Sequence, residues 1–173
     1  MYSKPLRYIA FGLSITGLVF SASLHVLTYW GYLPPPIAKA LHVLLFTLFL
    51  IVIIDFLRVS PDQTKKGLLQ VPRSWYVILA VAAVYATGTL VRFFLRAEFG
   101  TPVEEAGRYA LQNHGKFIKV LEREEFLTLN LMLERAISAH WIGFFLLLAV
   151  FFLRIDPHLR SHELQDPGPE KVD

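Results

Sequence analysis

The sequence predicts an all-α membrane protein with four transmembrane helices and a small extramembrane β-hairpin between the third and fourth helices. Of the 173 residues, 54% are hydrophobic, and they occur in blocks instead of being spread along the chain. Four blocks carry no charge: residues 8–38, 40–54, 74–91 and 136–153. A membrane-spanning helix needs about 20 mostly apolar residues, which each block reaches with its flanks. We therefore expect spans at about 6–30, 37–57, 74–95 and 136–155.

One face of the first span carries small and polar residues at helical spacing: Ala10, Ser14, Gly17, Ser21 and His25. Small side chains let two helix backbones approach closely inside a membrane. This face is therefore predicted to point into the bundle. Three prolines at 34–36 end the span, because proline supplies no N–H group, and the short link makes the second span antiparallel to the first.

Polar connections separate the later elements. Residues 59–73 and 98–106 contain proline, glycine and charged residues and are predicted to be surface connections. Residues 109–111 and 117–120 then suggest two short strands, joined by the Asn-His-Gly sequence at 113–115, where Asn and Gly tolerate positive φ. We expect a β-hairpin here.

The fourth helix is predicted to begin near Glu122 and to continue to Ile155, so that it projects from the bilayer before it enters. Its projecting part carries an apolar stripe that needs a partner, either the hairpin or another subunit: Phe126, Leu129, Leu133 and Ile137. The domain prediction is one four-helix transmembrane domain over 1–157, with the hairpin and helix extension at 97–135, followed by a polar tail at 158–173.

The distribution of Lys and Arg predicts how the bundle is oriented in the membrane. Lys and Arg are favoured in cytoplasmic loops, and Lys4 and Arg7 flank the first span. We expect both termini in the cytoplasm and the hairpin on the other side. The net charge of +3 is dispersed and does not indicate nucleic-acid binding. Without cysteine, the chain has neither disulfides nor thiolate metal ligands.

Three histidines fall near the same, outer face of the membrane in this topology: His25, His42 and His140. Ionisable residues within spans are functional candidates by default, and neutral imidazoles can hold copper or zinc or ligate haem iron. The alternative is a hydrogen-bonded structural role, for which His25 has the hydroxyls of Ser21 and Thr28 within one helical turn. No phosphate-binding loop, metalloprotease motif or serine nucleophile motif is present, so enzyme activity is the less favoured class.

Several segments resemble a group of small bacterial multi-pass membrane proteins of unknown function. They are residues 23–31, the Asn-His-Gly turn at 113–115 and the Ser-Ala-His-Trp sequence at 138–141. The resemblance implies a place in the bacterial cytoplasmic membrane and brings no activity with it. The chain is more weakly similar to four-helix b-type cytochrome subunits, which implies that His42 and His140 hold one outer haem b.

Two functions follow as expectations. The first is a non-catalytic accessory or structural subunit, embedded in the lipid bilayer, which binds a protein partner or a second copy through an outer-face docking surface made by the stripe at 126–137. The alternative is an electron-transfer membrane protein that binds b-type haem or a metal ion through its outer-face histidines.

Overall fold

A computed structural model of the chain describes residues 4–33, 40–58, 61–69, 71–105 and 107–155. The predicted polar tail at 158–173 and the proline link at 34–36 lie outside these residues.

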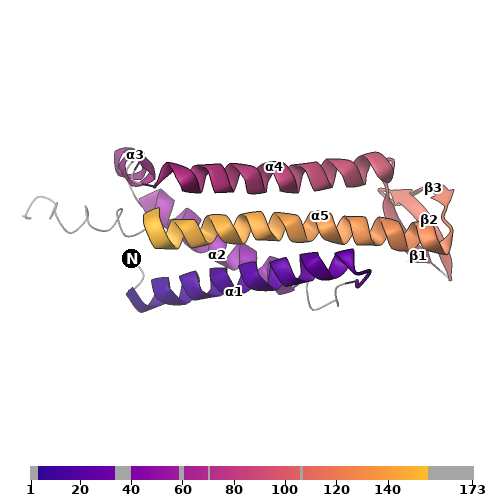
Figure 1. The fold of residues 1–173 in the computed structure, drawn as a ribbon, viewed down its shortest axis with the longest axis horizontal. Coiled ribbons are helices and arrows are strands. Elements are labelled where there is room, and N and C mark those ends of the chain that lie inside the picture. Colours follow the sequence, from indigo (N-terminus) through magenta and orange to yellow (C-terminus); the bar gives the residue numbers. More distant parts are fainter. Residues whose placement is uncertain (1–3, 34–39, 59–60, 70, 106, 156–173) are drawn as a thin grey trace, which may run out of the picture.

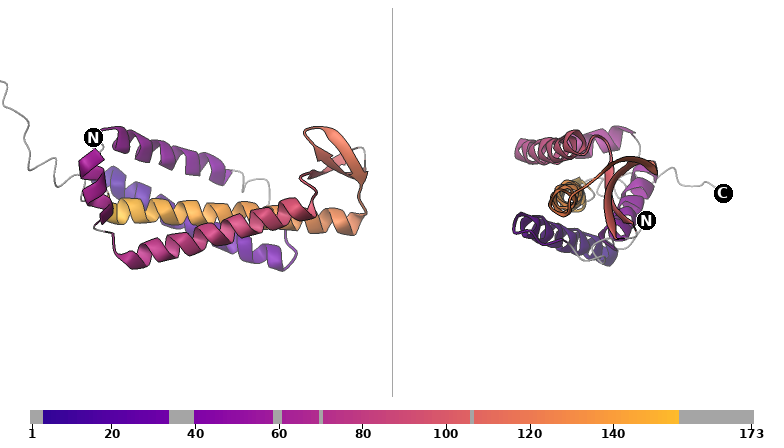
Figure 2. Two further views of the ribbon diagram at one scale, coloured as in Figure 1. Left: turned by 90° about the horizontal axis from the view of Figure 1, so that it is seen from above. Right: turned by 90° about the vertical axis from the view of Figure 1, so that its right-hand side faces the viewer.

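Four long helices run along the long axis of the molecule in alternating directions (Figure 1). They are α1 (Lys4–Tyr29), α2 (Ala40–Arg58), α4 (Arg73–Arg96) and α5 (Arg123–Val150), and α5 continues into a π-helical turn, η2 (Phe151–Ile155). The central helix is α5, with α1 and α4 on opposite sides of it (Figures 1 and 2). The last helix in the sequence is thus the one around which the others pack.

Three helices among the described residues are long and apolar enough to cross a membrane: Leu6–Tyr29, Arg73–Arg96 and Arg123–Leu153. They coincide with the first, third and fourth predicted spans. The apolar part of α2 covers only Ala40–Ile54, so the second span stays a prediction. The fourth helix begins at Arg123 and runs without a break into the bundle, which confirms the expected continuity.

The connection at 59–73 contains a helix that the sequence did not predict, α3 (Pro61–Leu69). Proline is favoured in the first turn of a helix because its missing N–H has no partner there, and Asp62 follows it, where an acid complements the helix dipole. Val71 is buried just after the helix. The expected surface connection is therefore partly helical, and most of the described residues of α3 are exposed.

The predicted hairpin is confirmed as β2 (Arg108–Asn113) and β3 (Lys116–Val120), antiparallel to each other. In the turn between them, His114 and Gly115 have φ values of 49° and 78°. Gly115 agrees with the prediction, whereas Asn113 ends β2 and His114 takes the other left-handed position.

A third strand, β1 (Thr101–Glu105), pairs antiparallel with β2 and completes a sheet of order β1-β2-β3. Residues 98–106 were expected to form a loop, and that prediction was wrong over Thr101–Glu105. Pro102 and two glutamates conceal the strand in the sequence, but an edge strand tolerates proline because its outer side makes no ladder hydrogen bonds.

The face of α1 that carries small residues packs closely on α5, as predicted. Ala10, Ser14 and Ser21 are buried, and a Cβ atom at Gly17 would lie 2.5 Å from the Phe145 ring. Small residues thus let the two backbones approach until an aromatic ring fills the space above a glycine.

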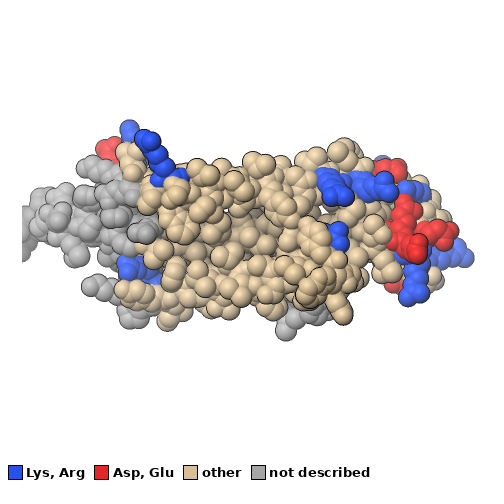
Figure 3. All heavy atoms as spheres, in the orientation of Figure 1, with Lys and Arg blue, Asp and Glu red and all other residues tan. Residues whose placement is uncertain are grey.

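A second core lies where the sheet folds over the end of α4 and the beginning of α5 (Figure 2). Its buried residues come from all of these elements and from their connections: Phe93, Ala97, Leu111, Leu121, Leu129 and Ala136. Charged side chains of both signs surround this end of the molecule, and much of the surface shown along the helices is uncharged (Figure 3). We call the sheet and the adjoining first turns of α5 the cap.

Candidate functional site

The apolar stripe on the projecting part of α5 is covered by the chain itself. Phe126 stacks on Tyr109 of β2 with the ring centroids 4.5 Å apart. Leu129 is buried in the core of the cap, Leu133 packs against it, and Ile137 packs against the core of the helix bundle. The cap, which includes one of the two partners that the sequence allowed, therefore covers Phe126, Leu129 and Leu133, whereas Ile137 also lines the groove described below.

His25 is held by hydrogen bonds at both ring nitrogens. Its Nδ1 lies 2.8 Å from Ser138 Oγ on α5, and its Nε2 lies 2.7 Å from the Tyr85 hydroxyl on α4. The hydroxyls expected as partners, Ser21 and Thr28, instead donate to the carbonyls of Gly17 and His25 on α1 itself. Hydroxyl side chains in a helix readily bond the carbonyl one turn back, which leaves the imidazole free to bridge to other helices.

The hydrogen bonds of His25 belong to a larger polar cluster that joins three helices. The hydroxyls of Tyr85 and Tyr29 lie 3.1 Å apart, and the Arg135 guanidinium lies over the Tyr29 ring at 4.4 Å. Arg135 also donates from Nη2 to the Thr28 carbonyl at 2.7 Å. That carbonyl belongs to the last turn of α1, where a cation favourably meets the negative end of the helix dipole.

Sequence reasoning found His25 but missed its partners. His25 and Tyr29 are four residues apart and share one helix face, which is the signal that links them. Tyr85 carried no comparable signal, because its contact with α1 depends on how α4 is rotated against α5. The cluster of His25, Tyr29, Tyr85, Arg135 and Ser138 fixes α1, α4 and α5 at one level of the bundle.

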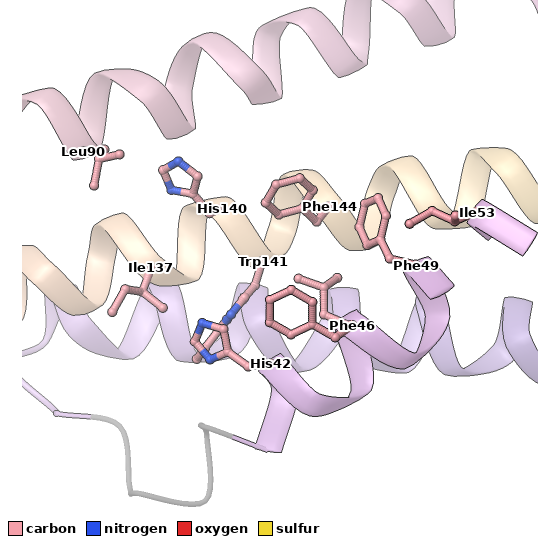
Figure 4. Close-up of a pocket in the computed structure, with 10 residues that line it drawn as sticks. His42, Phe46, Phe49, Ile53, Leu90, Ile137, His140, Trp141 and Phe144 are labelled. Atoms are coloured by element: carbon pink, nitrogen blue, oxygen red, sulfur yellow. The ribbon is translucent and has the colours of Figure 1, made fainter. Parts of the chain in front are cut away.

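His42 and His140 lie in a different place, in an apolar groove of about 520 Å³ between α2 and α4 with α5 as its floor. His140 projects from α5 toward α4, while His42 lies beside Trp141 (Figure 4). The groove is lined by His42, Leu45, Phe46, Phe49, Ile53, Leu90, Ile137, His140, Trp141 and Phe144.

The two histidines of the groove have different environments. The His42 ring meets the Trp141 ring edge-on, with centroids 4.8 Å apart. His140 Nδ1 lies 2.7 Å from the Ala136 carbonyl. A carbonyl oxygen only accepts hydrogen bonds, so Nδ1 is the protonated nitrogen and Nε2 of the neutral ring keeps its lone pair.

The three histidines do not meet at one centre. Among the described residues, no group of three or more His, Cys, Asp or Glu side chains is arranged to hold a metal ion. His25 is engaged by Ser138 and Tyr85, outside the groove. His42 and His140 both line the groove, but His140 is directed toward α4 whereas His42 packs on Trp141.

The chain matches no protein-family model, and no similar protein was found among curated sequences or among solved structures. Both resemblances therefore stay predictions. The fold and the sites define a mostly helical protein with three candidate membrane-spanning helices and a small antiparallel sheet at one end.

Proposed function

We propose that the protein is a non-catalytic accessory or structural subunit of the bacterial cytoplasmic membrane, with its helices in the bilayer and its cap on the outer side. The observation that supports this most is the surface of α4. The most apolar 18-residue window of α4 has a mean hydropathy of 1.9, yet only 11% of that window is buried within the molecule. Large contiguous apolar surfaces are rare on soluble monomers, whereas lipid favours them.

The proposal includes α2 as a fourth span and both termini in the cytoplasm. Arg7, Lys65 and Arg73 lie in the elements at the end of the bundle opposite the cap, and Lys and Arg are favoured on the cytoplasmic side. A reporter that is active only in the cytoplasm tests this. It is expected to be active at the C-terminus and inactive when inserted at Gly107, where added atoms meet open space. The reverse pattern would invert the orientation.

With the stripe on α5 covered, we place the docking surface of this subunit on the outer side of the cap. Strand β3 is at an edge of the sheet, and two of its apolar side chains, Phe117 and Val120, are exposed. An edge strand offers unpaired backbone groups to another chain, and exposed apolar residues beside them favour pairing.

The full chain, extracted in mild detergent, is expected to show a homo-oligomer or a hetero-complex by native mass spectrometry. The double substitution Phe117→Ser with Val120→Ser is expected to release the protein as a monomer. Leu69→Ser, an exposed leucine at the opposite end of the bundle, is the matched control and is expected to leave the complex intact. A monomer in the unsubstituted protein contradicts the docking function.

Electron transfer through a b-type haem is the second candidate, supported by the shared groove of His42 and His140. The bond from His140 Nδ1 to Ala136 orients the ring and leaves Nε2 for iron, as is usual for histidine ligands. An absorption spectrum of the purified protein tests this candidate. It predicts a Soret band that is lost in His42→Ala and in His140→Ala and kept in His114→Ala, a substitution in the exposed β2–β3 turn. Colourless protein ends the haem hypothesis.

A further inference from the structure

The groove between α2 and α4 has the length of one membrane leaflet. Its lining on α2 extends from His42 to Ile53, eleven residues along a helix, or about 17 Å at 1.5 Å per residue. The hydrocarbon core of a bilayer is about 30 Å thick, so one leaflet contributes about 15 Å. The volume of about 520 Å³ is within the range of pockets that hold small molecules.

The two ends of the groove differ in polarity. Its polar lining residues, His42, His140 and Trp141, lie in the half of the groove nearer the start of α2 at Ala40, where Leu90 and Ile137 also line it (Figure 4). Its other end is formed by aromatic and aliphatic side chains, among them Phe49 and Ile53. A ligand that matches this gradient has a polar group near the start of α2 and an apolar body that extends toward the middle of the bundle.

One wall of the groove contains a buried hydrogen-bond donor without a partner. Trp141 is 3% exposed, and its Nε1–H group finds no acceptor among the described residues. In Figure 4 the indole extends from α5 toward His42. The nitrogen is covered by protein atoms, so a ligand in the groove reaches it only when the ring turns toward the groove. An unmet buried donor costs about 1–3 kcal/mol, and the hydrocarbon region offers no water to satisfy it.

The N–H group of the indole also favours a ligand with a hydrogen-bond acceptor over other ligands. Indole nitrogen only donates, so the missing partner is an acceptor such as a carbonyl oxygen. Haem ligation would use the imidazole lone pairs and would leave this donor unmet. In a membrane, the ester of a glycerolipid carries a carbonyl at the top of an acyl chain, which is the order of polar and apolar parts that the groove presents.

We propose that the groove binds one acyl chain of a membrane glycerolipid, whose ester carbonyl accepts a hydrogen bond from Trp141 Nε1–H. The chain extends past Phe46 and Phe49 toward Ile53, between α2 and α4. The bound lipid completes the packing of α2 and α4 on α5, which protein side chains leave open at this level. This inference rests on the proposed membrane location. It is independent of the docking surface, and it is an alternative to the haem because both ligands would occupy the same groove.

The experiment compares two probes that differ only in the carbonyl: diester and diether phosphatidylcholine with the same chain length. Membrane integration is first established by resistance to alkaline extraction, and protein that is extracted refutes the membrane location itself. The full chain is then reconstituted with each probe, and the lipid retained per chain is counted by native mass spectrometry. Retention of one diester lipid is expected, with about fivefold weaker retention of the diether, as the loss of one net hydrogen bond predicts.

Trp141→Phe keeps an aromatic ring of similar shape and removes the donor, so it is expected to abolish the preference for the diester. Trp30→Phe, an exposed indole at the end of α1, is the matched control and is expected to keep the preference. Equal retention of the two lipids by the unsubstituted protein, or a preference that survives Trp141→Phe, would overturn the proposal. A Soret band or a co-purifying quinone would also overturn it, because each identifies a different occupant of the groove.

Discussion

The two sides of α5 are packed differently: one is in close contact with α1, and the other forms the floor of the groove between α2 and α4. Phe145 faces α1 and is 0% exposed, whereas its neighbour Phe144 faces the groove and is 43% exposed. On the first side, Ser14, Gly17 and Ser21 let the α1 backbone come close enough for Phe145 to fill the interface. On the second side, large residues of α2 and Leu90 of α4 form walls that do not close. One helix is therefore both the centre of the core and the floor of a site.

The largest expected effect comes from truncating one phenylalanine on each side. Phe145→Ala removes a fully buried ring and is expected to lower the free energy of unfolding by about 3–5 kcal/mol. Phe144→Ala removes a half-exposed ring from the groove and is expected to cost under about 1 kcal/mol. Reversible unfolding in mixed detergent–lipid micelles measures both. Similar costs for the two substitutions would contradict the distinction between the sides.

A second pair of substitutions probes the close approach of α1. Gly17→Ala places a methyl group within 2.7 Å of three ring atoms of Phe145, and overpacking of this kind costs about 1–3 kcal/mol. Gly12 lies on the same helix with nothing within 4 Å, so Gly12→Ala is expected to be neutral or slightly stabilising. The unfolding assay above applies, and a neutral Gly17→Ala would show that the helices are farther apart than described.

The polar cluster around His25 stabilises the contact of α1 with α5 through hydrogen bonds. Ser138→Ala removes the partner of His25 Nδ1 and is expected to cost about 1 kcal/mol, since hydrogen bonds between membrane helices average about 0.6 kcal/mol and an unmet buried group adds to that. Ser23→Ala serves as the control, because the Ser23 hydroxyl donates to the Val19 carbonyl of its own helix on an exposed face. An equal loss in both variants would mean that the bond between His25 and Ser138 contributes nothing specific.

The smallest effect is expected in the cap. The hydrogen bond to Glu125, followed by the hydrogen bond to Glu98, raises the pKa of Lys119 above its ordinary 10.5. A raised pKa in the folded state stabilises the protein below about pH 10.5, and this stabilisation is lost as pH rises through the folded pKa. Lys119→Gln is therefore expected to flatten the alkaline part of the stability profile. An alkaline profile of Lys119→Gln that matches the profile of the unsubstituted protein would contradict this account.

Helix positions were readable from the sequence because uncharged blocks of membrane-spanning length mark the long helices, and the spacing of small residues marks the face of α1 that packs on α5. The small-residue face of α1, the unbroken α5 and the turn at 113–115 all follow from local chemistry. Strand β1 was missed since Pro102 and its glutamates hide its alternation, and α3 was missed since it is short and polar.

The sites were less predictable, because they depend on the rotation of each helix. His25 was singled out correctly as a hydrogen-bonded candidate, but its partners lie on α4 and α5, 60 and 113 residues away in the sequence. The stripe at 126–137 was identified as apolar, yet only the folded sheet decides whether it is covered. No sequence pattern indicated that the Nε1–H group of Trp141 would be buried without a hydrogen-bond acceptor.

The two-sided character of α5 is tested most directly by a nitroxide scan, which is simple in a chain without cysteine. Single cysteines at 144, 145, 147 and 148 carry the label in bilayers, and collisions with dissolved oxygen report contact with lipid. Accessibility is predicted to be high at 144 and 147, whose native residues are 43% and 40% exposed, and low at 145 and 148. Low accessibility at all four positions, or maxima at 145 and 148, would contradict an open groove on one side of α5.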